Sequence, residues 1–119
     1  QGFRIGPLVL VAAPLEIQQG IKVEFLEEAR SEIPLVMGLT NESIGYAVDR
    51  DVAARGGYAA DLVPYICGQL PFANMHDELV SALRELEAKL VGTDKGSTGN
   101  GPKTGETVRR VPKPDRTEE

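Results

Sequence analysis

Cysteine, histidine and tryptophan are nearly missing from this sequence of 119 residues, which contains one Cys, one His and no Trp. With Cys67 as its single cysteine, the chain has no internal disulfide, and we expect a buried structural thiol at this position. His76 has no second histidine at ligand spacing, so we expect its imidazole on the surface or at a helix cap. Neither residue by itself predicts a catalytic or metal site.

Long apolar runs and an excess of basic residues are missing as well. No run approaches the roughly 20 apolar residues that span a bilayer, so we expect no transmembrane segment. The formal net charge of −5 argues against a nucleic-acid partner. The chain shows no signal peptide, but it starts at Gln1, and we interpret this end as a cut through a longer protein. The sequence therefore does not indicate the cellular compartment of the protein.

The composition divides the chain into two parts. Residues 1–90 hold nearly all the large apolar side chains, whereas residues 91–119 are rich in Gly, Thr, Lys, Pro and Asp. A segment with so few apolar side chains cannot offset the entropy that it loses on ordering. We therefore predict a folded part over 1–90 and a disordered polar tail over 91–119. A docking motif around Arg109 and Arg110 is the alternative for the tail.

Apolar periodicity in the first part predicts a strand, a helix and a second strand. Residues 7–13 form a continuous apolar run, which is typical of a strand covered on both faces. Residues 15–30 have a helical stripe that includes Ile21 and Phe25, and residues 35–39 form a second apolar run. A strand, a helix and a strand in about 35 residues make a βαβ unit, whose two strands should be parallel.

The rest of the first part predicts shorter elements and one long helix. Residues 49–55 indicate a helical turn, and residues 58–66 a loop with an edge strand. The last helix should begin after the cap residue Asn74, stop at Gly92 and carry an apolar stripe of Leu79, Ala82, Leu83, Leu86 and Leu90. The fold class is therefore α/β, a fragment of a mixed sheet with a βαβ unit and a C-terminal amphipathic helix, followed by a disordered tail. Two strands leave sheet edges exposed, so we expect the remainder of a parent domain to supply others.

Polar side chains follow both predicted strands, where ligands gather in α/β folds. Glu16 comes after the first strand, and Asn41 and Tyr46 follow the second. Each residue also has an ordinary explanation. A carboxylate is favoured in the first turn of a helix, Asn shapes turns, and a half-buried Tyr satisfies its hydroxyl. Taken one at a time, these residues do not predict a site.

As a linked series, the motifs between about residues 5 and 90 resemble the neutral/alkaline non-lysosomal ceramidases, in particular the compact bacterial members. That family has a strand that ends in Pro-Gly-Glu, a strand that ends in Gly-Leu-x-Asn, a Gly-Tyr pair, a Thr-Arg-like turn and a Gly-Gly-Tyr. The matching residues here are Pro14-Leu15-Glu16, Gly38-Leu39-Thr40-Asn41, Gly45-Tyr46, Arg50 and Gly56-Gly57-Tyr58.

The resemblance implies part of a zinc-dependent amidohydrolase domain that cleaves an N-acyl, ceramide-like amide through a metal-activated water. It implies Glu16 and Tyr46 as zinc ligands and Tyr58 as the residue that stabilises the oxyanion. The other ligands would be upstream histidines outside this chain. Carboxylates and imidazoles are ordinary zinc ligands, whereas a tyrosine ligand is uncommon. A phenol is a suitable donor to a developing oxyanion.

Leu15 departs from the family pattern, because it replaces a glycine that permits close backbone approach. Its side chain could tilt Glu16 or narrow the site. This leaves a second hypothesis, a non-catalytic α/β module or subunit that keeps the fold and has lost the metal. Under the first hypothesis, the partners are an N-acyl lipid or other small amide substrate and the remainder of the parent catalytic domain.

Overall fold

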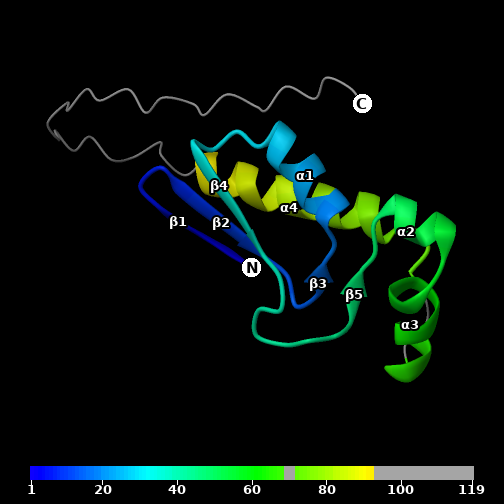
Figure 1. Ribbon diagram of the computed structural model, residues 1–119. Coiled ribbons are helices and arrows are strands. Elements are labelled where there is room, and N and C mark those ends of the chain that lie inside the picture. The colour runs from blue at the N-terminus through cyan, green and yellow to red at the C-terminus, as the bar shows by residue number, and fades with distance from the viewer. Residues whose placement is uncertain (69–71, 93–119) are drawn as a thin grey trace, which may run out of the picture.

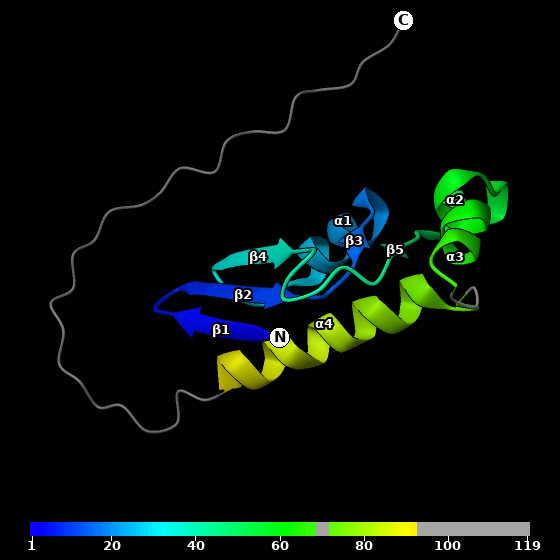
Figure 2. The same ribbon diagram turned by 90° about the horizontal axis from the view of Figure 1, so that it is seen from below.

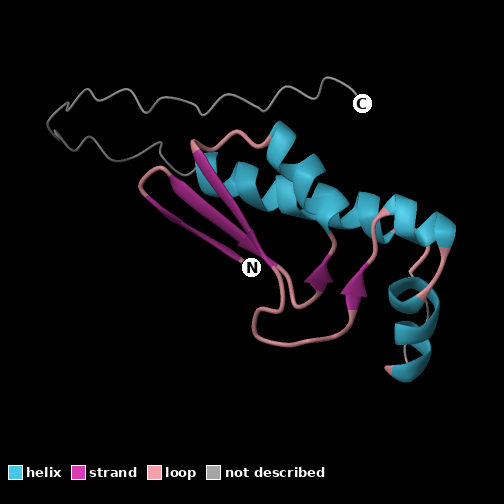
Figure 3. Cartoon of the chain, viewed as in Figure 1, coloured by secondary structure: helices cyan, strands magenta, loops and turns pink. Residues whose placement is uncertain are grey.

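A computed structural model describes residues 1–68 and 72–92 of the chain. It has a mixed three-stranded sheet, a short two-stranded sheet and helices of very different lengths (Figures 1 and 3). The elements in chain order are β1 (Gly2–Ile5), β2 (Leu8–Ala12), β3 (Glu16–Ile17), α1 (Gln19–Glu28), β4 (Ile33–Met37), β5 (Tyr46–Ala47), α2 (Arg50–Arg55), the π-helical turn η1 (Tyr58–Leu62), α3 (Val63–Ile66) and α4 (Met75–Gly92). The predicted α/β class is confirmed.

The expected βαβ unit is formed by β2, α1 and β4. The two strands pair in parallel from Leu8 opposite Ile33 to Ala12 opposite Met37, and α1 connects them. The larger sheet has the order β1-β2-β4, with β1 antiparallel to β2. The sequence did not predict β1, which supplies the third strand from within the chain.

The core lies between one face of this sheet and the helices α1 and α4 (Figure 2). Val9 and Val11 of β2 point to this side, and both are almost fully buried. They pack with Ile21 and Phe25 of α1 and with residues of α4. Residues that alternate along a strand point to opposite faces, so the continuous apolar run of β2 also places apolar side chains on the other side.

The other side of the sheet is apolar and largely uncovered in the described residues. The register puts side chains of all three strands in rows across this face, because directly paired residues point the same way. Five of the side chains are between 44% and 67% exposed. We call this surface the open sheet face, and its residues are Phe3, Ile5, Leu8, Leu10, Ile33, Leu35 and Met37.

Three expectations from the sequence are wrong in this part of the chain. Residues 58–66 are helical instead of a loop with an edge strand, because Ala59 and Ala60 favour a helix and the Gly57 amide donates to the Asp61 carboxylate at 2.6 Å. Cys67 is exposed, since α3 buries little more than Val63. On α4, Ala82 is exposed, and the fully buried stripe is His76, Val80, Leu83 and Glu87.

The helix α4 ends at Gly92, where the sequence predicts its stop. This end lies two residues past the boundary of the folded part that was drawn at residue 90. The predicted polar tail lies outside the described residues from position 93 onward. No helix within the described ranges is long and apolar enough to cross a membrane.

Candidate functional site

The two-stranded sheet brings Glu16 and Tyr46 together. They are direct partners in the parallel β3–β5 pair, so their side chains point to the same face. The Tyr46 hydroxyl interacts with the Glu16 carboxylate on this face. This contact is the largest cause that raises the pKa of Tyr46 above its usual value, followed by burial.

The backbone between β4 and β5 fixes this pairing. It runs beside residues 13–16 through a series of hydrogen bonds, among them Leu39 N to Leu15 O at 3.0 Å and Glu16 N to Gly45 O at 2.9 Å. The approach at Gly38 is so close that an added Cβ would lie 2.6 Å from the Leu15 carbonyl oxygen. Asn41 has a φ of 67°, so it shapes this turn in a conformation that Asn tolerates.

Leu15 does not enter the site, so its side chain neither tilts Glu16 nor narrows the site, two effects that the sequence left open. It is 7% exposed and belongs to the hydrophobic core. Glu16, the next residue, is exposed on the opposite face. Glu16 also lies in a strand and not in a first helical turn, because α1 begins three residues later at Gln19. The helix dipole therefore does not explain its position.

Tyr58 joins this pair through its ring. The rings of Tyr46 and Tyr58 make an edge-to-face contact with centroids 6.1 Å apart and an interplanar angle of 84°. Gly57, at φ 112°, turns the chain immediately before Tyr58. The Tyr58 side chain is 62% exposed, so its hydroxyl remains accessible beside the Glu16–Tyr46 pair. All three residues from the motif series thus meet at one place.

A cavity of about 260 Å³ opens next to Tyr46. Its walls come from α2, η1, α3 and the start of α4, and they are a mixture of apolar and polar side chains. The apolar members are Tyr46, Val48, Ala53, Ala59, Ala60, Val63, Pro64, Phe72, Ala73 and Met75. Arg50, Asp61, Asn74, His76 and Asp77 add polar groups.

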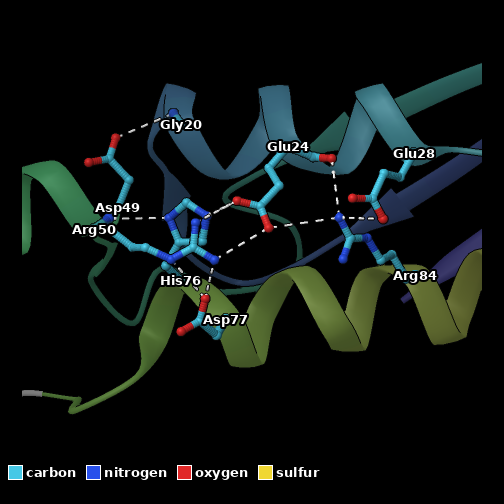
Figure 4. A network of polar contacts seen from close by, with 8 residues as sticks. All are labelled: Gly20, Glu24, Glu28, Asp49, Arg50, His76, Asp77 and Arg84. Atoms are coloured by element: carbon cyan, nitrogen blue, oxygen red, sulfur yellow. Dashed lines mark hydrogen bonds and ion pairs between the residues drawn. The ribbon is translucent and has the colours of Figure 1, made fainter.

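A polar network borders this cavity and connects three helices (Figure 4). The Arg50 guanidinium of α2 contacts Glu24 of α1 at 2.6 Å and also contacts Asp77 of α4. Nε2 of His76 lies 2.9 Å from Glu24, and Nδ1 accepts the Arg50 backbone amide at 3.2 Å. Since Nδ1 accepts, Nε2 carries the hydrogen that is donated to Glu24.

His76 is therefore not a surface residue, since it is only 7% exposed. It does act as a cap, but for the first amide of α2 and not for its own helix. The hydrogen bonds from Arg50 and then from His76 lower the pKa of Glu24 from 4.5 to about 2. Sequence reasoning overlooked this network. One signal in the sequence could have indicated it. His76 and Glu87 fall on the same face of the predicted helix as the buried apolar residues, which is where a buried polar contact would form.

The Glu16 and Tyr46 oxygens suit part of a zinc site, because a carboxylate and a phenolate on one face can both donate to a cation. The described residues contain no group of three or more His, Cys, Asp or Glu side chains placed to hold a metal. His76 is occupied in the helix network. A complete catalytic zinc site usually has three protein ligands, so this pair amounts to an incomplete set.

Comparisons with known proteins give no family for the chain. No protein-family model, no curated protein and no solved structure matches it. Any functional assignment therefore depends on the residues themselves and on how they are arranged.

Proposed function

We propose that this chain forms part of the catalytic centre of a zinc-dependent amidohydrolase that cleaves an N-acyl, ceramide-like amide. The proposal includes two partners, the remainder of the catalytic domain with its histidine ligands and the lipid-like amide substrate. One observation carries it. Glu16 and Tyr46 lie 30 positions apart in the motif series, yet they are register partners whose side chains point to the same face and interact.

Each of the three residues has a role that its position supports. Glu16 and Tyr46 would hold the ion from one side. Tyr58, with its exposed phenol next to Tyr46, would donate to the oxygen that becomes negative during amide cleavage. Bound zinc would supply a nucleophilic water near neutral pH and polarise the carbonyl.

The neighbouring cavity supports a substrate with an apolar part. Alanines and Val63 supply an apolar part of its walls, and Tyr46 connects it to the proposed metal ligands. Its polar rim, which includes Arg50 and Asn74, could receive hydroxyl or amide groups of the same substrate.

The first test is the zinc content of the protein made from its full reading frame. We expect Glu16→Ala to remove bound zinc and amidase activity together, because a carboxylate ligand is lost. Glu27→Ala is the matched control, since it removes an exposed carboxylate from α1. Metal analysis and hydrolysis of a fluorescent N-acyl sphingosine would be measured. Full zinc occupancy in Glu16→Ala would refute the proposal.

Tyr58→Phe separates catalysis from metal binding. We expect kcat to fall by about 10²- to 10³-fold, the range seen when one oxyanion donor is removed, while zinc occupancy stays unchanged. The edge-to-face contact with Tyr46 is retained by Phe, so the fold should be preserved. An unchanged kcat would exclude the oxyanion role.

A non-catalytic α/β module is the second candidate. The observation that favours it is the incomplete ligand set within the described residues. In that case the Glu16–Tyr46 pair is structural, and the protein from the full reading frame would be stable and well folded without zinc.

A further inference from the structure

We propose that the cavity between α2, η1, α3 and the start of α4 is a binding site for a small primary amine with an apolar body. The described residues that line it supply apolar walls and oxygen acceptors, but no cation that is not already paired with a carboxylate. The inference is separate from the proposed function, because it requires neither zinc nor a residue outside the described part of the chain.

The volume of the cavity limits the ligand to a small molecule. About 260 Å³ corresponds to roughly nine water molecules at about 30 Å³ each. Most of the lining residues are apolar, among them Val48, Ala59 and Val63. Apolar walls with a few polar groups are the usual composition of a small-molecule site. A single ring or a short aliphatic chain with one polar group at its end matches this volume.

Arg50 is the one permanently cationic side chain among the described lining residues, and all three nitrogens of its guanidinium are engaged (Figure 4). Nη1 contacts Glu24 at 2.6 Å, Nε contacts Asp77 at 2.9 Å, and Nη2 contacts both carboxylates. A carboxylate or phosphate on a ligand would have to compete with these two partners. The arrangement therefore disfavours an anionic ligand.

Two carboxylates of the lining keep one oxygen each for a ligand. In Asp61, Oδ2 accepts the Gly57 amide at 2.6 Å, and Oδ1 makes no hydrogen bond within the described residues. In Asp77, Oδ1 receives both contacts from Arg50, so Oδ2 has no partner in the same part of the chain. An ammonium group has three donors and no acceptor, so it complements these oxygens. Such charge-assisted hydrogen bonds are about twice as strong as neutral ones.

The amino end of α4 also borders the cavity, and a helix amino end by itself favours an anion. Its macrodipole corresponds to about half a positive charge. Asp77 and Glu78 in the first turn place two full negative charges at this end, and Asp61 adds a third from η1. With the charge of Arg50 balanced by Glu24, these carboxylates outweigh the dipole. The field in the cavity therefore favours a cation.

The wall that carries Asp61 has an unusual backbone. The turn η1 is π-helical, and such turns are rare and occur often at functional sites. Gly56, at φ 72°, precedes it, and a Cβ at this position would lie 2.6 Å from the Asp61 carboxylate. The absence of a side chain at Gly56 thus allows the carboxylate to reach the Gly57 amide. The local backbone holds Asp61 beside the alanines of the cavity wall.

Three ligands of similar size and different charge test the polarity of the site. Phenethylamine carries an ammonium group, phenethyl alcohol is its neutral counterpart, and phenylacetate is an anion. Each is titrated by calorimetry, at neutral pH, into the protein made from its full reading frame. We expect the amine to bind at least about tenfold more tightly than the alcohol, and phenylacetate to bind more weakly than both. An amine that binds no more tightly than either of the others would overturn the inference.

Asp61→Asn tests the charge without disturbing the turn, because the carboxamide oxygen can still accept the Gly57 amide. We expect the affinity for phenethylamine to fall about tenfold and the affinity for phenethyl alcohol to stay unchanged. Asp51→Asn is the matched control, since it removes the same charge from an exposed position of α2 that does not line the cavity. Equal losses of amine affinity in the two variants would overturn the inference.

Two neighbouring alanines of α2 locate the site. Both are exposed, but only Ala53 lines the cavity, whereas Ala54 does not. Ala53→Leu fills part of the space, so it should weaken the binding of amine and alcohol alike by at least about fivefold. Ala54→Leu adds the same side chain elsewhere and should leave both affinities unchanged. Equal binding by the two variants would place the ligand outside the cavity and overturn the inference.

Glu16→Ala separates this inference from the proposed function, because Glu16 is a proposed zinc ligand that does not line the cavity. We expect phenethylamine to bind this variant as tightly as it binds the wild type. Loss of amine binding in Glu16→Ala would assign the amine to the metal site and overturn the inference. The zinc content of the wild type and of the same variant tests the proposed function, so the two proposals can fail independently.

Discussion

Glu87 shows how one buried charge can join distant parts of the chain. Its side chain is 2% exposed and accepts hydrogen bonds from the amides of Arg30 and Ser31 and from the Ser31 hydroxyl, the last at 2.6 Å. Burial raises the pKa of Glu87, but these hydrogen bonds outweigh it and leave the pKa lowered. The carboxylate thus fixes the connection between α1 and β4 to α4.

We predict that Glu87→Ala lowers the free energy of unfolding by about 3 kcal/mol, because three part-buried donors lose their acceptor. Glu87→Gln keeps one acceptor oxygen and should lose less. The measurement is urea denaturation followed by circular dichroism. Glu85→Ala, an exposed change on the same helix, is the control and should stay close to the wild type. A small effect of Glu87→Ala would show that water replaces the carboxylate.

At the scale of elements, the loop between β4 and β5 determines the site. We predict that Gly38→Ala destabilises the protein by about 2 kcal/mol, because the new Cβ would meet a backbone oxygen that cannot rotate away. The shift would also separate Tyr46 from Glu16 and weaken zinc binding in the full protein. Gly92→Ala has open space and should leave stability unchanged or slightly higher. Equal stability of the two variants would contradict the prediction.

The elements that the sequence predicted are those with a local signal. The strand at the continuous apolar run of β2, the helical turn of α2 and the long helix α4 depend on neighbouring residues and are confirmed. The strands β3 and β5 have two residues each and exist only because the chain brings them together. No periodicity of the sequence could indicate them.

The candidate site was partly predictable for a similar reason. The motif series named Glu16, Tyr46 and Tyr58, and the fold brings these three together. The burial of Leu15 and the Glu24–His76 contact depend on which face each element presents after packing. Composition predicted His76 as a surface or capping residue. The structure shows that it is buried and that it caps α2, so only the capping role is confirmed.

At the scale of the whole molecule, Glu24 is the point where α1, α2 and α4 meet. Arg50 and His76 both contact it, and Arg84 of α4 lies 3.8 Å away. Its pKa falls from 4.5 to about 2 on folding, so the contact stabilises the folded state above about pH 4.5. This stabilisation is lost progressively as the pH falls towards 2, because the folded protein must then accept a proton that the unfolded chain binds more readily.

We therefore predict that Glu24→Gln makes the free energy of unfolding less dependent on pH below about pH 4.5. At pH 7 the variant should be less stable than the wild type, and the difference should shrink between pH 4.5 and 2 as Glu24 of the wild type becomes protonated. Urea denaturation at a series of pH values measures it. Glu27→Gln, on the exposed side of the same helix, should follow the wild-type curve. Parallel curves for Glu24→Gln and the wild type would mean that the three helices are held together without this charge.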